Sequence, residues 1–282
     1  MPHRQILATV LLAHHFESAF TPDQVYRYLR VPMSRTQFVA HLGDLKASGR
    51  VWERDGALFA ESLAETHRRK RGWSRALFAA HRPVLGLLTR FPWVRFMALT
   101  GANSFESCRQ RDDIDLFIVT RRGRLWLCYG LLALFSKLVG RRGLLCINYL
   151  VDEDHLAIEP RDYYTAVQIV QMVPLLDGET GDRLLAANPW LFEVLPNAAA
   201  QMGGLTGYRL RTAPSRESRA GGLLSRLNRS VYRRYARHLA AKFPADMGSG
   251  IVLGEGLAKL NRVDHHDIYE SIYRRIDARI AV

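Results

Sequence analysis

Two aspartates stand two residues apart at the start of a strand-like run of the chain. Asp113 and Asp115 flank Ile114 in the segment DIDLFIV, which follows a mostly polar loop that begins at Gly101. Side chains two apart on a strand point to the same face of the sheet, so the two carboxylates are expected side by side. Their charges repel each other, and a divalent cation shared between them would offset that repulsion. The spacing therefore predicts a metal site.

Apolar runs on both sides of the loop must hold this pair in place. Residues 94–99 (VRFMAL) and 114–119 (IDLFIV) have the composition of buried strands. Further elements are expected to follow them: a helix over 125–139, a strand over 144–151 and a helix from about Pro160. Strands that are separated by helices indicate an α/β unit with a mixed sheet. We assign residues 93–197 to this unit.

The first 61 residues have signals for three short helices and a hairpin. Thr21 followed by proline, and Ser34, are typical residues at the starts of helices. Asp55-Gly56 stands between two short strand-like runs, which is a strong hairpin signal. Three helices followed by a hairpin resemble a winged helix-turn-helix domain, which we assign to residues 1–61.

The third of these helices would be the DNA-reading helix of such a domain. It offers Arg35, His41 and Lys46 beside Asp44, which is a thin basic face. Two interpretations stay open: DNA binding through this helix, or a domain that serves packing or dimerisation.

Two further segments are rich in basic residues. Residues 62–92 are expected to form a helical connector that begins with the cluster HRRKRGWSR, which is expected to be a solvated face, or else a surface that faces phosphate. Residues 198–282 are expected to be a loop followed by helices, with GSGIVLGEG as a turn before the last helix. Between Arg209 and Lys242 there are ten Lys or Arg and one acid, with tyrosines among them. This pattern fits either a surface for phosphate or nucleic acid, or a helix docked on the core with a solvated basic face.

The composition limits the classes of protein. The chain has 282 residues, 48% of them apolar, and a formal net charge of +13, which favours anionic partners such as nucleotides, nucleic acid or a lipid surface. Three widely spaced cysteines suggest neither a disulfide framework nor a zinc site. The most apolar segment, 125–139, is too short to span a bilayer and is expected to be a buried helix. We therefore expect a cytoplasmic protein with no transmembrane segment, and keep peripheral membrane attachment through 125–139 and the basic tail as a weaker alternative.

The aspartate pair and the glycine before it resemble the nucleotidyltransferase superfamily, which includes DNA polymerase beta, the CCA-adding enzymes and small bacterial nucleotidyltransferases. The family pattern is Gly followed by Gly or Ser, about ten residues, and acid-x-acid on the next strand. Gly101-Ala102, ten intervening residues and Asp113-Ile114-Asp115 match that spacing. The order of strands and helices extends the resemblance over roughly residues 94–197.

The resemblance implies Mg²⁺, or Mn²⁺ in its place, held by Asp113 and Asp115, and an NTP whose phosphates lie on the glycine turn. The residues implied for that turn are Gly101, Ala102, Asn103 and Ser104. Ala102 departs from the family pattern, but its backbone amide could still bind phosphate.

A second departure concerns the third carboxylate, which the family places on the following strand. Asn148 occupies the expected position in CINYLV, and an amide is not a general base. One of the acids at 152–154 could substitute for it, although these residues are expected to lie past the end of the sheet. His155 could approach the site from the sheet edge but is expected to be structural, and Cys108, which has no nearby His partner, is not expected to act as a nucleophile. His265 with His266 is not expected to bind metal because adjacent helical residues face different directions.

These observations predict an α/β (α+β) protein with a small mixed-sheet nucleotidyltransferase core, an N-terminal winged helix and a C-terminal helical segment. The first hypothesis is a Mg²⁺-dependent transfer of NMP from an NTP to an acceptor of unknown class: RNA, a phosphorylated metabolite or a protein side chain. The alternative is a catalytically degenerate nucleotide-binding module coupled to a winged-helix regulator that binds DNA.

Overall fold

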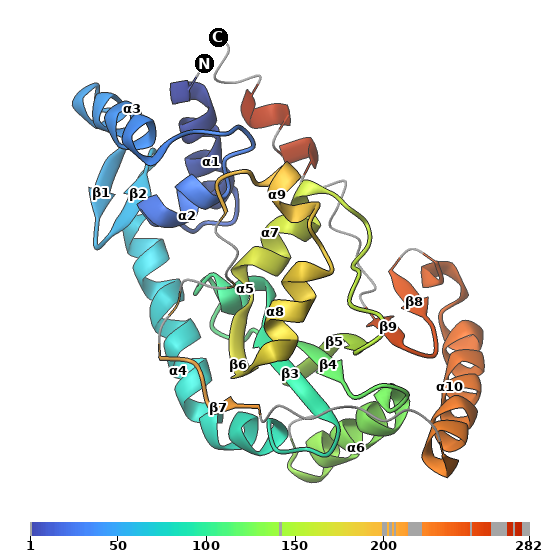
Figure 1. Ribbon diagram of the computed structural model, residues 1–282. Coiled ribbons are helices and arrows are strands. Elements are labelled where there is room, and N and C mark those ends of the chain that lie inside the picture. The colour runs from blue at the N-terminus through green and yellow to red at the C-terminus, as the bar shows by residue number, and fades with distance from the viewer. Residues whose placement is uncertain are drawn as a thin grey trace.

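A mixed β-sheet flanked by helices on both faces forms the centre of the molecule (Figure 1). The computed structural model describes residues 2–140, 143–198, 202, 205, 207–213, 222–248, 250–260, 270–272 and 274–277. A mixed sheet that is flanked by helices belongs to the expected α/β class. Within the described residues the main sheet has seven strands in the order β7-β6-β3-β4-β5-β9-β8. Their bounds are β3 (Val94–Leu99), β4 (Ile114–Thr120), β5 (Leu145–Asp152), β6 (Val173–Asp177), β7 (Arg211–Thr212), β8 (Ile251–Leu253) and β9 (Leu257–Leu260).

Both parallel and antiparallel pairings occur in this sheet. β4 and β5 are parallel, as are β6 and β7, and the other pairs are antiparallel. Parallel pairing of β4 with β5 requires a crossover, which α6 (Leu125–Leu138) provides. The three strands expected at 94–99, 114–119 and 144–151 all form, and they lie side by side in the sheet.

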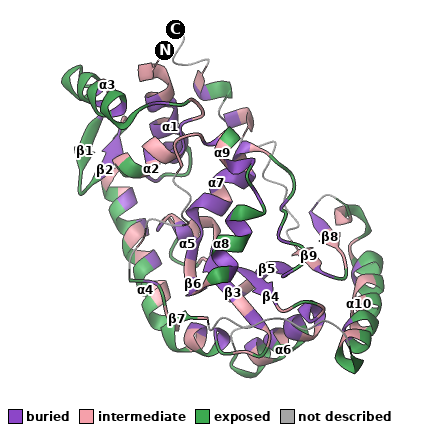
Figure 2. Ribbon diagram, viewed as in Figure 1, coloured by how far each residue is buried: buried purple, intermediate pink, exposed green. Residues whose placement is uncertain are grey.

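Alternate residues of the central strands pack into two separate cores, one on each face of the sheet. Figure 2 shows that the central strands are mostly buried. Phe96 and Phe117 face α7 (Tyr163–Gln171), α8 (Glu179–Ala186) and α9 (Leu191–Val194). Met97 and Ile118 face the opposite side, where α4 (Ala64–Leu88) and α6 pack. α10 (Leu223–Lys242) lies against α6 from outside.

The N-terminal elements form where the local signals place them. They are α1 (Pro2–His15), α2 (Pro22–Arg27), α3 (Arg35–Ala47), β1 (Trp52–Arg54) and β2 (Ala57–Phe59). Thr21 and Ser34 each cap a helix through a reciprocal capping box. Asp55 and Gly56 have φ of 51° and 74°, as a two-residue hairpin turn requires. The cores of α1 to α3 are continuous with the α7 face of the sheet.

Three features differ from the sequence-based expectation. β6, α8 and α9 were not expected, and they complete the sheet after α7. Residues 251–260 form the hairpin β8–β9 rather than a turn before a helix, because two short apolar runs surround Gly254 and Gly256. The segment that contains His265 and His266 lies outside the described residues.

α6 is not the buried helix that was expected. Its residues Trp126, Cys128 and Leu132 are buried, whereas Leu134 and Leu138 are 55% and 76% exposed. The helix is therefore half-buried, with an apolar stripe on its outer side. None of the helices in the described ranges has the length and hydropathy needed to cross a membrane.

Candidate functional site

The two aspartates of the predicted metal site lie together at one end of the central strands. A carboxylate oxygen of Asp113, one of Asp115 and the Cys146 sulfur all lie within 4.8 Å of one another. All three residues are partly exposed. Two carboxylates at this separation repel each other, and a cation bound between them would offset that repulsion. The donor atoms and their spacing suit a divalent metal ion.

Strand geometry brings these three side chains together. In β4, Ile114, Leu116 and Ile118 are buried against the α6 side, so Asp115 points to the α7 side. Asp113 is the residue just before the strand, and Cys146 on β5 is the direct neighbour of Asp115 across the parallel pair. Direct neighbours in a sheet share a face, which places the thiol beside the carboxylate.

Gly101 forms the turn that supports Asp115 from the end of β3. The Thr100 amide donates a hydrogen bond to the Asp115 carbonyl oxygen at 3.1 Å, and Gly101 follows with φ of +54°. A Cβ atom on Gly101 would lie 2.8 Å from Asp115 Oδ2, which is closer than van der Waals contact. Only glycine combines this left-handed backbone with such a close approach to the carboxylate.

The other predicted turn residues have different surroundings. Gly101 and Ala102 line the large cleft described below. Asn103 and Ser104 are buried in the short helix α5 (Gly101–Ser104), and neither lines that cleft. The Asn103 side-chain amide donates to the Asp113 carbonyl oxygen at 3.0 Å, and the Ser104 hydroxyl donates to the Gly101 carbonyl oxygen at 2.9 Å. These two side chains therefore brace the turn that precedes the aspartates.

Asn148, the predicted position of the third family carboxylate, lies at an irregularity in β5. The strand pairing runs from Leu116 with Ile147 to Phe117 with Tyr149, so Asn148 is an additional residue in β5. The bulge brings Cys146 and Tyr149 to the same face, although they are three residues apart. The side chain of Asn148 lies outside the described part of the chain.

A large open cleft lies over the aspartates, between the sheet and the N-terminal helices. Its volume is about 1090 Å³. One wall is formed by the end of α1 and the loop after it, from Ala13 to Phe20, and the opposite wall by α7. The aromatic residues that line it are Phe16, Phe20, Phe105, Phe117, Tyr149 and Tyr164. The aspartates thus face an open cleft that two protein segments shape together.

Two lysines of this cleft were not identified from the sequence. Lys259 on β9 lies directly opposite Tyr149 in the sheet, and within the described residues its ammonium group has no ion pair or hydrogen bond. Lys70 is buried, donates a hydrogen bond to the Phe16 carbonyl oxygen at 2.7 Å and lies 3.6 Å from Glu17. Lys70 thus holds the loop after α1, whereas Lys259 is available to an anionic ligand.

The basic cluster at the start of α4 is partly structural rather than a solvated face. Arg71 and Arg75 bind the buried carboxylate of Glu106 at 2.8 and 2.9 Å, and the Tyr208 hydroxyl donates to it at 2.7 Å. Burial alone would raise the pKa of Glu106, but the hydrogen bonds from Arg75, Tyr208 and Arg71 outweigh it and hold that pKa below its ordinary value. This cluster fixes the loop between Gly101 and Asp113.

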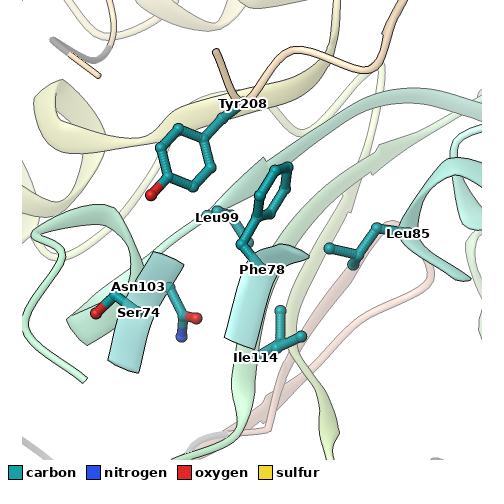
Figure 3. Close-up of a pocket in the computed structure, with 7 residues that line it drawn as sticks. All are labelled: Ser74, Phe78, Leu85, Leu99, Asn103, Ile114 and Tyr208. Carbon is teal, nitrogen blue, oxygen red and sulfur yellow. The ribbon is translucent and has the colours of Figure 1, made fainter. Parts of the chain in front are cut away.

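A small apolar hollow lies behind the same loop, between α4 and the central strands. Figure 3 shows Phe78 beside Tyr208, and the two rings lie 4.5 Å apart. Asn103 and Ser74 lie next to them, and Ser74 accepts a hydrogen bond from the Cys108 amide at 2.9 Å. The hollow is too narrow for a water molecule, so its residues support the loop and do not form a second binding site.

The acids at 152–154 do not replace the third carboxylate, and Asp152, which was expected past the end of the sheet, is the last residue of β5. Asp152 pairs with Thr120 at the far end of the parallel strands, five residues from Asp115, which is roughly 16 Å along a strand. Its carboxylate is buried and contacts His155 Nδ1 at 2.6 Å and the Gly123 amide at 3.0 Å. Asp152 and His155 therefore have a structural role, as was expected for His155.

Two other candidates also have local roles. Burial raises the pKa of the Cys108 thiol to about 11, so it is protonated at neutral pH and unsuited to nucleophilic catalysis, as expected. On the exposed side of α3, Arg35 pairs with Asp23 and Lys46 pairs with Glu53. The thin basic face predicted for this helix is thus largely neutralised by acids of its own domain.

Comparison of the chain with protein-family models, with curated proteins and with solved structures gives no match.

Proposed function

We propose that this chain is a Mg²⁺-dependent nucleotidyltransferase that transfers NMP from an NTP to an acceptor held in the cleft. The observation that supports this most directly is the meeting of Asp113 and Asp115 beside Gly101, at the base of a cleft large enough for substrates. A turn glycine packed against one of two adjacent carboxylates serves no evident packing purpose, and it fits a site where phosphate and metal meet.

The donor atoms fit Mg²⁺ or Mn²⁺. Mg²⁺ is commonly held by one or two carboxylates, with water and substrate phosphates filling its other positions. Asp113 and Asp115 supply such a pair, whereas the Cys146 thiol is a softer donor that Mg²⁺ does not favour. When bound, the ion would neutralise the phosphate charge and polarise the phosphoryl group.

The chain's own residues have distinct roles in this proposal. Gly101 lets the backbone approach the triphosphate, and it holds Asp115 in place by packing against its carboxylate. Lys259 extends a positive charge into the cleft from the neighbouring strand and would bind a phosphate oxygen. Tyr149 and Tyr164 offer aromatic faces on which the base could stack.

The residue beside Asp115 on β5 determines whether the site has a base that could deprotonate the acceptor. That neighbour is Cys146, which is not a carboxylate base. An acceptor that is already anionic, such as a phosphate, does not need deprotonation before it attacks. We therefore favour a phosphorylated acceptor over an alcohol. The cleft volume of about 1090 Å³ exceeds the roughly 300–1,000 Å³ of a typical single-ligand pocket, so an NTP and an acceptor fit together.

Binding of Mn²⁺ tests the site without knowledge of the acceptor. Free Mn²⁺ is measured by electron paramagnetic resonance while the protein is titrated with and without NTP. We expect the wild type to bind Mn²⁺ in the presence of NTP, and Asp113→Asn and Asp115→Asn to lose this binding. Asp154→Asn is the matched control, because Asp154 pairs with Arg122 at the far end of the sheet. Equal Mn²⁺ binding by all four proteins would show that the aspartates are not the ligands.

A further inference from the structure

A second group of metal-ligating side chains lies on the N-terminal helices, apart from the cleft. His3 is in the first turn of α1, and His41 and Asp44 are three residues apart on α3. The two helices pack against each other, as Figure 1 shows. None of the three residues lines the cleft. In the sequence, His41 and Asp44 indicated only a thin basic face, and His3 was not singled out.

The separations of their ligand atoms suit a four-coordinate metal ion. His3 Nε2 lies 2.9 Å from Asp44 Oδ2, and His41 Nδ1 lies 3.8 Å from the same oxygen. All three ligand atoms lie within 4.8 Å of one another. Zinc bonds of roughly 2.0–2.1 Å in tetrahedral geometry place ligand atoms roughly 3.3 Å apart, which is between the two observed separations. Small side-chain rotations would therefore complete the site.

His41 has a ring nitrogen without a hydrogen-bond partner among the described residues, which indicates that a ligand binds there. Its Nδ1 atom is shielded from solvent and has no hydrogen-bond partner in the described residues. At 3.8 Å, Asp44 Oδ2 is too distant for a hydrogen bond. Buried polar atoms in proteins are nearly always paired, and an ion between the nitrogen and the carboxylate would satisfy both.

The types of ligand distinguish this group from the aspartate pair. Two imidazoles and one carboxylate suit zinc and other borderline divalent metals, whereas Mg²⁺ prefers oxygen donors. We propose that His3, His41 and Asp44 bind a zinc ion, with a fourth position open to water. The Asp44 carboxylate is largely exposed, so the ion can enter from solution without opening of the fold.

A bound ion would connect the start of α1 to the middle of α3. These segments are about forty residues apart in the sequence, and besides apolar packing they are joined here by the contact of His3 with Asp44. The ion would fix the position of α3, the helix on the outer side of the N-terminal domain. This inference does not depend on the proposed transferase activity, because it uses other residues and another class of metal.

Zinc binding by the full chain tests the proposal. The metal-free protein competes for Zn²⁺ with a chromophoric chelator, and the variants are His3→Gln, His41→Gln and Asp44→Asn. We expect one Zn²⁺ per wild-type chain and at least a tenfold weaker affinity in each variant. His238→Gln, which removes an exposed histidine on α10, is expected to bind Zn²⁺ like the wild type. Melting in chelator should show that the variants remain folded.

Replacement of zinc by Co²⁺ gives a second readout, because Co²⁺ in a tetrahedral site of nitrogen and oxygen ligands has strong visible absorption. We expect this spectrum in the wild type and its loss in His41→Gln. The proposal is wrong if the wild type binds no stoichiometric Zn²⁺. It is equally wrong if binding persists in the three ligand variants, or if His238→Gln weakens binding as much as they do.

Discussion

Replacement of Gly101 by alanine is expected to affect the metal site much more than the stability of the fold. Gly101 has φ of +54°, a conformation that costs an alanine about 1–2 kcal/mol. The new Cβ would also lie 2.8 Å from Asp115 Oδ2, where ordinary contact begins at 3.4 Å. Because that oxygen ends a short side chain, the carboxylate can rotate away at little cost to stability. The variant should remain folded while its metal site is disturbed.

Gly56→Ala is the matched control. Gly56 has φ of +74°, so it carries the same backbone cost, but no atom lies within 4 Å of its new Cβ. For 282 residues the entropy of unfolding is about 0.6 kcal/mol/K, so a cost of about 1–2 kcal/mol lowers Tm by about 2–3 °C. Both variants should show this decrease in the absence of ligand.

The two variants should differ only when Mg²⁺ and NTP are added. Displacement of a group that orients a metal ligand typically weakens metal affinity by about 10–100-fold. We therefore expect Gly56→Ala to keep the wild-type rise in Tm with Mg²⁺ and NTP, and Gly101→Ala to lose most of it, as measured by differential scanning fluorimetry. If Gly101→Ala responds like Gly56→Ala, the contact with Asp115 does not position a metal ligand and the reasoning is refuted.

Three further predictions concern other residues of the site and its support. Lys259→Met should weaken NTP binding about tenfold in calorimetric titration, the loss of one charge-assisted hydrogen bond, while Lys242→Met on the exposed side of α10 should not. Cys146→Asp adds a third carboxylate beside Asp115 and should tighten Mn²⁺ binding; weaker binding would mean that this position does not face the metal. Glu106→Gln should destabilise the protein by about 2–3 kcal/mol at pH 7 in urea unfolding. Because the pKa of Glu106 is lowered in the folded state, that difference should shrink as pH falls below the ordinary value of 4.5, and a constant difference would contradict the charged cluster.

Features that depend on neighbouring residues were predictable from the sequence. Thr21 and Ser34 begin helices because their side chains bond to amides three residues on, and Asp55-Gly56 forms a hairpin because both tolerate positive φ. The meeting of Asp113 and Asp115 follows from their spacing of two residues, with Asp113 just before β4 and Asp115 within it. Each of these rules acts over a few residues, so one sequence was sufficient.

The arrangement around Asp115 could not be predicted in the same way. Strict alternation in CINYLV would place Asn148 on the face of Cys146, but the extra residue in β5 interrupts that alternation. A bulge depends on how two strands pair, and nothing within CINYLV marks it. The role of Asn148 stays a prediction, while the presence of Cys146 at the site became evident only from the pairing.

Lys259 was missed because its strand was missed. Gly254 and Gly256 separate two short apolar runs, which is a hairpin signal, but this segment was interpreted as a turn before the last helix. The roles of Arg71 and Arg75 could not be predicted either, because their partner Glu106 lies more than thirty residues away. A charge run alone does not reveal which of its members are paired.

The most direct test of the proposed function is the Tm of the purified chain with each of the four NTPs, with and without Mg²⁺, beside Asp115→Asn and Asp154→Asn. A ligand that binds the folded state raises Tm by mass action. We predict a rise with at least one NTP that requires Mg²⁺, is lost in Asp115→Asn and persists in Asp154→Asn. The absence of any Mg²⁺-dependent rise, or the same rise in Asp115→Asn, would contradict the assignment of the aspartate pair as a metal and nucleotide site.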